Sequence, residues 1–141
     1  MNKFETFVVS SVAMCILGAS SAAIAQSSRD ELIAKGAKQL GGAELRQLLS
    51  GKKISGPTYD GGALSWTLKS DGSFSGSGQY PSGSTDHRGT WSVNEKGQFC
   101  FQNLVSWPGG SNRDVACQDW YRLGSDFYAI RDGNVLKREV K

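Results

Sequence analysis

His87 is the residue best suited to acid–base chemistry, because it is the only histidine among the 141 residues and follows Asp86. A catalytic histidine needs an orienting carboxylate and a nearby nucleophile. Side chains adjacent in sequence diverge on a strand or loop, so Asp86 does not supply this geometry by proximity alone. No G-x-S-x-G motif of a serine hydrolase is present. The sequence therefore favours a solvated loop histidine over a catalytic one.

Carboxylates are the second group that could do chemistry. Most aspartates fall at expected turns, where the side chain can bond the local backbone: Asp60, Asp71, Asp86, Asp114, Asp119, Asp126 and Asp132. Their spacing is not that of a calcium loop, and one histidine cannot complete a zinc site. A carboxylate pair across a cleft would suit a glycoside hydrolase, and Glu95 with Asp119 is the pair considered. We expect no metal site and no cofactor.

The role expected of the cysteines depends on how the first 25 residues are interpreted. Met1 to Ala25 has a short polar start, an apolar stretch and a small-residue end, Ala23-Ile24-Ala25, which is the order of a cleavable secretory signal. Cleavage removes Cys15 and leaves Cys100 and Cys117, for which a disulfide is more typical of an exported chain than two free thiols. A bridge closing a loop of about 17 residues would contribute roughly 3 kcal/mol.

Three segments follow from this organisation: a cleaved signal at 1–25, a helical segment at 26–51 and an antiparallel β domain at 52–141. The alternative for the first segment is an uncleaved membrane anchor. Serines interrupt its apolar run and no basic stop-transfer cluster follows, so we expect no stable membrane insertion after cleavage. The expected location is the periplasm or the extracellular medium.

The charge pattern does not indicate a nucleic-acid partner. The net charge is +3, and the basic residues are scattered apart from the doublets Lys52-Lys53 and Lys137-Arg138. Nucleic-acid binding usually needs a basic face or stripe, whereas scattered charges are typical of a solvated surface.

The first mature residues are helical in character. Ser28 and Glu31 have the spacing of a capping box, and a helix is expected up to Leu40, with Gly41-Gly42 ending it. A second helix is expected from Ala43 to Ser50, ended by Gly51.

After Lys52 the apolar period changes from about 3.6 to 2, which predicts strands. The expected strands are 64–68, 74–80, 89–93, 98–104, 115–122, 127–131 and 135–140. Asp71-Gly72 favours a hairpin turn, residues 81–86 a polar loop and residues 107–112 a second loop. Gly76 and Gly78 suggest a bulge, a bend or close packing under an aromatic ring. The fold class is mainly β: an antiparallel meander of about six to eight strands forming a small barrel or sandwich, with one or two short N-terminal helices.

Several segments together resemble a family of small exported bacterial proteins called domain of unknown function 995. They are Gly42-Ala43-Glu44-Leu45-Arg46, Leu49-Ser50-Gly51-Lys52, Gly89-Thr90-Trp91-Ser92-Val93, Gln98-Phe99-Cys100, Cys117 with Trp120-Tyr121-Arg122, and Asp126-Phe127-Tyr128. The resemblance implies a disulfide-linked β domain of a Gram-negative envelope. It carries over no catalytic residue, because the family has no assigned activity.

Aromatic side chains are the best candidates for a binding surface. Trp66 and Trp91 lie in alternating strands and are expected in the core, whereas Trp107 lies in a loop held at both ends by the predicted bridge. Trp107 could anchor a sugar or a protein pocket, or it could fold back to plug the end of the barrel. The candidates for an adjoining binding surface are Tyr80, Trp120, Tyr121 and His87.

No motif identifies a specific activity. We expect a non-enzymatic binding or interaction module that uses residues 105–114 and contacts an envelope protein, a glycan or an extracellular protein. The alternatives are a secreted inhibitor of a hydrolase such as lysozyme, a barrel that binds an apolar ligand, and a glycan hydrolase that uses a carboxylate pair or His87.

Overall fold

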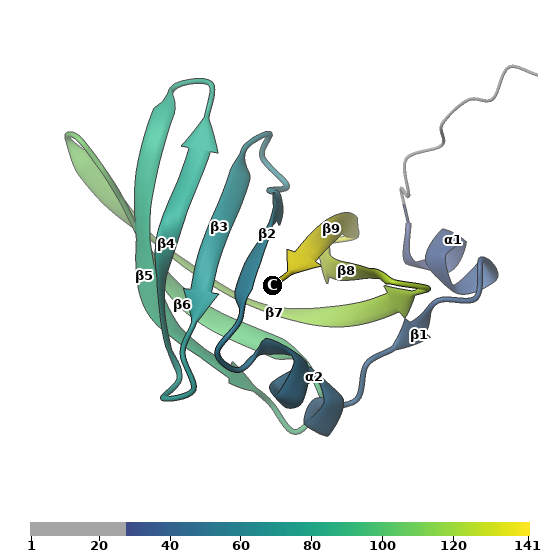
Figure 1. Cartoon of the computed structure of the whole chain (residues 1–141). Helices are drawn as coiled ribbons and strands as arrows, with labels where there is room; N and C mark the ends of the chain where they lie inside the picture. The colour runs from purple at the N-terminus through teal and green to yellow at the C-terminus, as the bar shows by residue number, and fades with distance from the viewer. Residues whose placement is uncertain (1–27) are drawn as a thin grey trace, which may run out of the picture.

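The computed structural model describes residues 28–141, so the predicted signal at 1–25 lies outside the described residues. The elements in chain order (Figure 1) are α1 (Arg29–Ala34), β1 (Lys38–Gln39), α2 (Gly42–Leu49), β2 (Lys53–Pro57), β3 (Ala63–Leu68), β4 (Ser73–Tyr80), β5 (Gly83–Val93), β6 (Phe99–Trp107), β7 (Gly110–Leu123), β8 (Asp126–Arg131) and β9 (Asn134–Val140). Neither of these two helices is long and apolar enough to span a bilayer.

Strands β2 to β9 form a closed antiparallel barrel. Each strand pairs with the next along the chain, and β9 pairs back with β2 to close the ring. Strand β7 pairs with β6 through Gly110–Gln118 and with β8 through Asp119–Leu123, while the two-residue strand β1 adds to its outer edge. The predicted β class and antiparallel meander are confirmed. Of the two predicted forms, barrel and sandwich, the structure is the barrel.

Helix α2 covers one end of the barrel (Figure 1). Its Leu45 and Leu49 are fully buried and belong to the main core, together with Trp66, Phe99 and Trp120. Helix α1 lies outside the barrel, where Leu32 packs in a second cluster. The barrel is therefore closed by packed side chains at the α2 end.

The predicted first helix is too long. It ends at Ala34, and Gly36 adopts a positive φ of 94°, a conformation that interrupts a right-handed helix. Residues 38–39 then form β1 on the edge of β7, where they gain sheet hydrogen bonds in place of a third helical turn. The second helix is confirmed within one residue at each end, with Gly51 at a φ of 74° after it.

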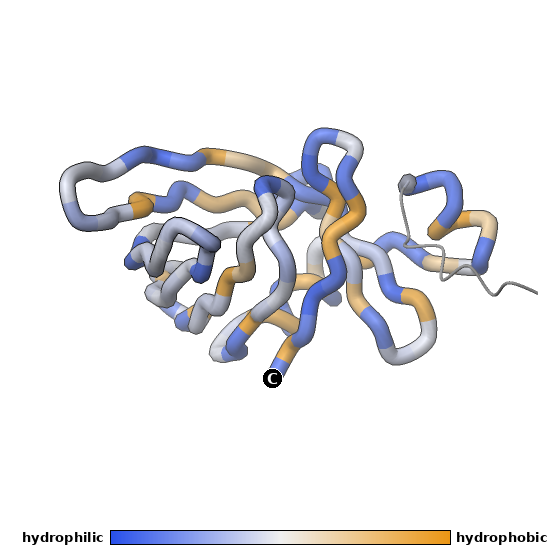
Figure 2. The backbone as a smooth tube through the Cα atoms, turned by 90° about the horizontal axis from the view of Figure 1, so that it is seen from above, coloured by the Kyte–Doolittle hydropathy of each residue, from blue (hydrophilic) through white to orange (hydrophobic). Residues whose placement is uncertain are grey.

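Two predicted loops are largely strand. Strand β5 begins at Gly83, so residues 83–86 pair with β4. Strands β6 and β7 form a hairpin with a turn at Pro108-Gly109, so most of the predicted 107–112 loop is paired as well. Seen from above in Figure 2, this β6–β7 hairpin projects beyond the rest of the barrel. The polar composition of both segments concealed their strand pairing.

The disulfide prediction is confirmed by the geometry. Cys100 and Cys117 lie directly opposite each other on β6 and β7, and the structure joins them at an S–S distance of 2.06 Å. Cys100 alternates with Phe99 and Phe101, which are buried in the barrel, so the bridge lies on the outer face of the sheet. It fastens the two strands below the projecting hairpin.

Candidate functional site

The end of the barrel opposite α2 contains a cavity of about 820 Å³. Its rim includes the β2–β3 loop (Thr58–Asp60), the β4–β5 turn (Ser82, Gly83) and the β6–β7 turn (Trp107, Pro108). The walls combine apolar and aromatic side chains (Ile54, Leu64, Trp66, Phe99, Phe101, Val105 and Leu136) with polar and charged ones (Thr85, His87, Asn103, Asp114, Gln118, Arg131 and Arg138). A concave cavity of this size, with aromatic walls and several convergent polar groups, is typical of a small-molecule site.

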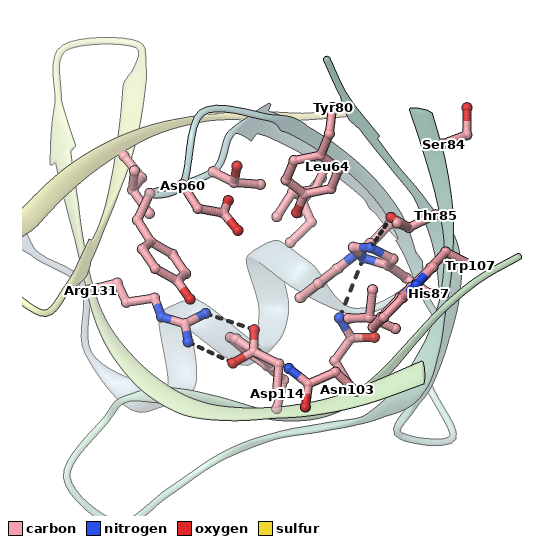
Figure 3. A pocket seen from close by; sticks show the side chains of 18 of the residues that line it. Asp60, Leu64, Tyr80, Ser84, Thr85, His87, Asn103, Trp107, Asp114 and Arg131 are labelled. Atoms are coloured by element: carbon pink, nitrogen blue, oxygen red, sulfur yellow. Dashed lines mark hydrogen bonds and ion pairs between the residues drawn. The ribbon is translucent and has the colours of Figure 1, made fainter. Parts of the chain in front are cut away.

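His87 projects from β5 into this cavity and is only 5% exposed. The indole N–H of Trp66 donates to its Nδ1 at 2.7 Å, and Nδ2 of Asn103 lies 3.3 Å from the same nitrogen. Its Nε2 lies 2.8 Å from Oγ1 of Thr85 (Figure 3). The prediction of a solvated loop histidine is therefore wrong, because β5 is paired on both sides and its alternation directs His87 inward.

These contacts assign the proton of His87. An indole nitrogen can only donate, so Nδ1 must be the acceptor, and the neutral ring carries its hydrogen on Nε2, where it donates to Thr85. Burial lowers the pKa of His87 below its ordinary value of 6.5, although Asp114, Asp86 and Asp60 act in the opposite direction. His87 is thus a neutral, fully engaged side chain, and the nitrogen that could accept a proton is already occupied.

An ion pair lies on another side of the cavity (Figure 3). Arg131 donates two hydrogen bonds to Asp114, Nη1 to Oδ2 at 2.8 Å and Nη2 to Oδ1 at 2.6 Å. The guanidinium also lies 4.4 Å from the ring centre of Tyr59. The bond to Asp114 raises the pKa of Arg131. This bidentate pair neutralises one positive and one negative charge of the cavity.

Arg138 is a second arginine of the cavity and is 4% exposed. Its Nη1 donates to the backbone carbonyls of Pro57 at 2.7 Å and of Lys137 at 3.1 Å. Burial, followed by the positive charge of Arg131, lowers the pKa of Arg138 to about 10. The charge pattern of the sequence predicted a position on the solvated surface for this residue. Its alternation with buried Leu136 on β9 was the signal that could have placed it inside.

Glycines make room for the polar groups of the cavity. A Cβ added at Gly78 would lie 2.6 Å from Oγ1 of Thr85, 2.8 Å from Nε2 of His87 and 2.9 Å from the ring of Tyr80. Close packing under an aromatic ring, one of the three predictions for this glycine, is therefore confirmed. Burial, with a smaller contribution from Asp60, raises the pKa of Tyr80, so its phenol is neutral.

The sequence of residues 13–135 matches the family described as "Protein of unknown function (DUF995)". The chain belongs to this family. No curated protein and no solved structure matches the chain significantly. The resemblance inferred from the sequence is confirmed, and the site of this DUF995 domain must be interpreted from its own geometry.

The predicted binding residues of the DUF995 domain separate into two groups. Tyr80, His87 and Trp107 line the cavity. Trp107 is 43% exposed, and its ring lies close against Gly110 across the turn, so it forms part of the rim and does not plug the barrel. Trp107 also projects from the paired β6–β7 hairpin, which replaces the expected loop as the candidate surface.

Trp120 and Tyr121 are not surface residues, contrary to the prediction. Trp120 is fully buried in the main core, and Tyr121 is 4% exposed in the second cluster with Leu32. Neighbouring residues of a strand point to opposite faces, and both faces of β7 are covered here, one by the barrel interior and the other by α1. The burial of Tyr121 depends on the packing of α1 outside the barrel, which could not be predicted from the sequence.

The candidate carboxylate pair, Glu95 and Asp119, is not part of the cavity. Glu95 is exposed in a turn, whereas Asp119 forms an ion pair with Arg29 and accepts from Nε2 of Gln98 at 3.1 Å. The carboxylates that do line the cavity are Asp60 and Asp114. Within residues 28–141, no three His, Cys, Asp or Glu side chains gather as potential metal ligands.

Proposed function

We propose that this DUF995 domain is a non-enzymatic binding protein whose barrel takes a small, largely apolar ligand. The observation that carries the proposal is the cavity of about 820 Å³ at the open end, which places aromatic and apolar walls beside convergent polar groups. The disulfide supports the expectation of an exported protein of the periplasm or the medium, because such bridges persist in oxidising compartments.

The hydrogen bonds of the cavity favour binding over catalysis. A general base must present a free acceptor to the substrate, but Nδ1 of His87 already accepts from Trp66. Oγ1 of Thr85 lies near Nε2 of His87 and at 3.5 Å from the carbonyl of Gly78, so its hydrogen is directed to the backbone and not to a base. This arrangement leaves Thr85 without the activation that a nucleophile requires.

The neutral fluorescent probe N-phenyl-1-naphthylamine tests the proposal. We expect saturable binding to the wild-type mature domain. Leu64→Trp, which fills the cavity, should abolish it, whereas Ala63→Trp, on the exposed neighbouring position of the same strand, should not. Absence of probe binding, or equal binding by both variants, would overturn the barrel as a ligand site.

A protein partner is the second candidate, and the projecting β6–β7 hairpin favours it. Leu104 and Val115 are 37% and 60% exposed on the outer face of this hairpin, and Trp107 is 43% exposed at its end, so the hairpin offers a partner apolar contacts. In this account the domain is an envelope interaction module or a secreted hydrolase inhibitor. Inhibition of lysozyme by the wild type, lost in Val115→Asp but kept in Leu64→Trp, would support the inhibitor; no inhibition would exclude lysozyme as the target.

A further inference from the structure

We propose that the ligand of the cavity carries a carboxylate, which binds to the guanidinium of Arg138, and an apolar body, which lies against the aromatic walls. This inference rests on the proposed binding function and names the chemical class of the ligand.

The position of Arg138 is built into the barrel. Its Nη1 uses both hydrogens on the carbonyls of Pro57 and Lys137. Gly56 permits this approach, because a Cβ at that position would lie 2.9 Å from Nη1 of Arg138 and 2.2 Å from the carbonyl oxygen of Lys137. The hydrogens on Nε and Nη2 make no hydrogen bond within residues 28–141 and remain for a ligand.

Arg138 also has no counter-charge of its own. Asp114 is held by Arg131 in the bidentate pair, and no carboxylate of residues 28–141 forms a salt bridge with Arg138. The remaining acid of the cavity, Asp60, is exposed at the rim. A buried guanidinium without an anion is unfavourable, and the reduced pKa of Arg138 reflects the same lack of compensation.

The geometry favours a carboxylate over a more highly charged group. The parallel N–H bonds from Nε and Nη2 match the two oxygens of a carboxylate, while a single free positive charge balances a single negative one. A phosphate dianion would leave one of its two charges without a partner in the cavity. Trp66, Phe101 and Leu136 line the same cavity and offer the apolar body its contacts.

Competition for bound N-phenyl-1-naphthylamine at pH 8 tests the inference with three probes of equal chain length: decanoate, 1-decanol and decyltrimethylammonium. For the wild type we expect decanoate to displace the probe at a concentration at least about tenfold lower than that required of 1-decanol. Decyltrimethylammonium should be the weakest of the three. Equal potency of decanoate and 1-decanol would overturn the inference and leave the proposed function intact. Displacement by none of them, with no probe binding, would overturn both.

Substitutions assign the preference to one residue. In Arg138→Gln the advantage of decanoate should disappear, while the potency of 1-decanol stays the same. The matched control is Lys137→Gln, which removes the same charge from the exposed neighbouring position of β9 and should keep the preference. Arg138→Met, which retains the length of the side chain, replaces the glutamine variant if the latter does not fold. A preference for decanoate that survives both Arg138 variants would contradict the assignment.

Discussion

The indole N–H of Trp66 donates a 2.7 Å hydrogen bond to Nδ1 of His87 inside the barrel. This bond connects β3 with β5 across β4, and Asn103 extends it to β6. A protonated His87 would carry a hydrogen on Nδ1 and would face the indole hydrogen directly. The Trp66–His87 pair is therefore compatible only with the neutral imidazole.

The pKa of His87 should rise when the indole donor is removed. Trp66→Phe retains a ring to stack on Phe74, whose centroid lies 4.5 Å from that of Trp66, but removes the shorter of the two donor contacts to Nδ1 and leaves only Asn103 at 3.3 Å. Because the chain has one histidine, an NMR titration of its Cε1 proton measures this pKa without ambiguity. Trp91→Phe is the matched control, since the Trp91 indole donates to the carbonyl of Lys69. A pKa that falls or stays the same in Trp66→Phe would contradict the assigned tautomer.

The stability of the domain should decrease as the pH falls below about 6.5. The unfolded chain takes up a proton at the ordinary pKa of His87, whereas the native state does so only at lower pH, so protons favour the unfolded state in this window. His87→Gln removes this contribution. Between pH 8 and pH 5, the free energy of unfolding of the wild type should therefore fall relative to that of the variant. Parallel curves would show that His87 does not titrate on unfolding.

The burial of His87 also explains where sequence reasoning failed. A strand that lines a polar part of a cavity has inward residues such as Thr85 and His87, so the alternation of apolar and polar residues that identifies a half-buried strand is missing in this part of β5. Arg138 was placed on the surface for a different reason: the pattern of β9 does alternate, but a charged residue at an inward position is read as exposed. The strands whose inward residues form the core, such as Leu64 to Leu68, were predicted correctly because their pattern follows burial.

The hairpin turns and the disulfide could be predicted because they depend on local chemistry. Gly72 adopts a φ of 88° in the predicted turn, and Asp71 accepts from the backbone N–H of Ser73 at 2.8 Å. The cavity could not be predicted in this way. Arg138 on β9 bonds to the carbonyl of Pro57 on β2, 81 residues earlier in the chain, and only closure of the barrel by β9 on β2 brings these two residues together.

Loss of the disulfide should destabilise the domain by roughly 3 kcal/mol, because the bridge closes a loop with a sequence separation of 17 residues. Chemical denaturation of Cys100→Ala/Cys117→Ala measures the effect. Dithiothreitol should reproduce it in the wild type and leave the double variant unchanged. Two alkylatable thiols in the mature protein, or an unchanged midpoint after reduction, would refute the bridge.

Gly76→Ala should destabilise the barrel by about 3 kcal/mol or prevent folding. An added Cβ would lie 1.9 Å from the carbonyl oxygen of Ser65 and 2.8 Å from Cα of Trp66, so β3 and β4 would have to separate. Ser75→Ala, on the exposed side of the same strand, serves as the control and should change stability by less than about 0.5 kcal/mol. A Gly76→Ala domain as stable as this control would contradict the packing of β3 on β4.

Arg138→Met should stabilise the unliganded domain by about 1 kcal/mol, because it replaces a buried charge that has no counter-ion by an apolar chain of similar length. Thermal unfolding without added ligand measures this gain. Lys137→Met on the exposed face of β9 should leave the midpoint nearly unchanged. A marked loss of stability in Arg138→Met would mean that Arg138 has a structural role, with its bonds to Pro57 and Lys137 outweighing the cost of its burial.

The central claim is that the open end of the barrel binds an apolar carboxylate through Arg138. An NMR titration of the isotope-labelled mature domain with decanoate tests it most directly. We expect the Nε–H resonance of Arg138 and the ring resonances of His87 and Trp66 to shift in a saturable manner, while Leu32 and Tyr121 in the outer cluster stay unchanged. Saturation without a shift at Arg138, or shifts confined to the outer face of the barrel, would contradict the account.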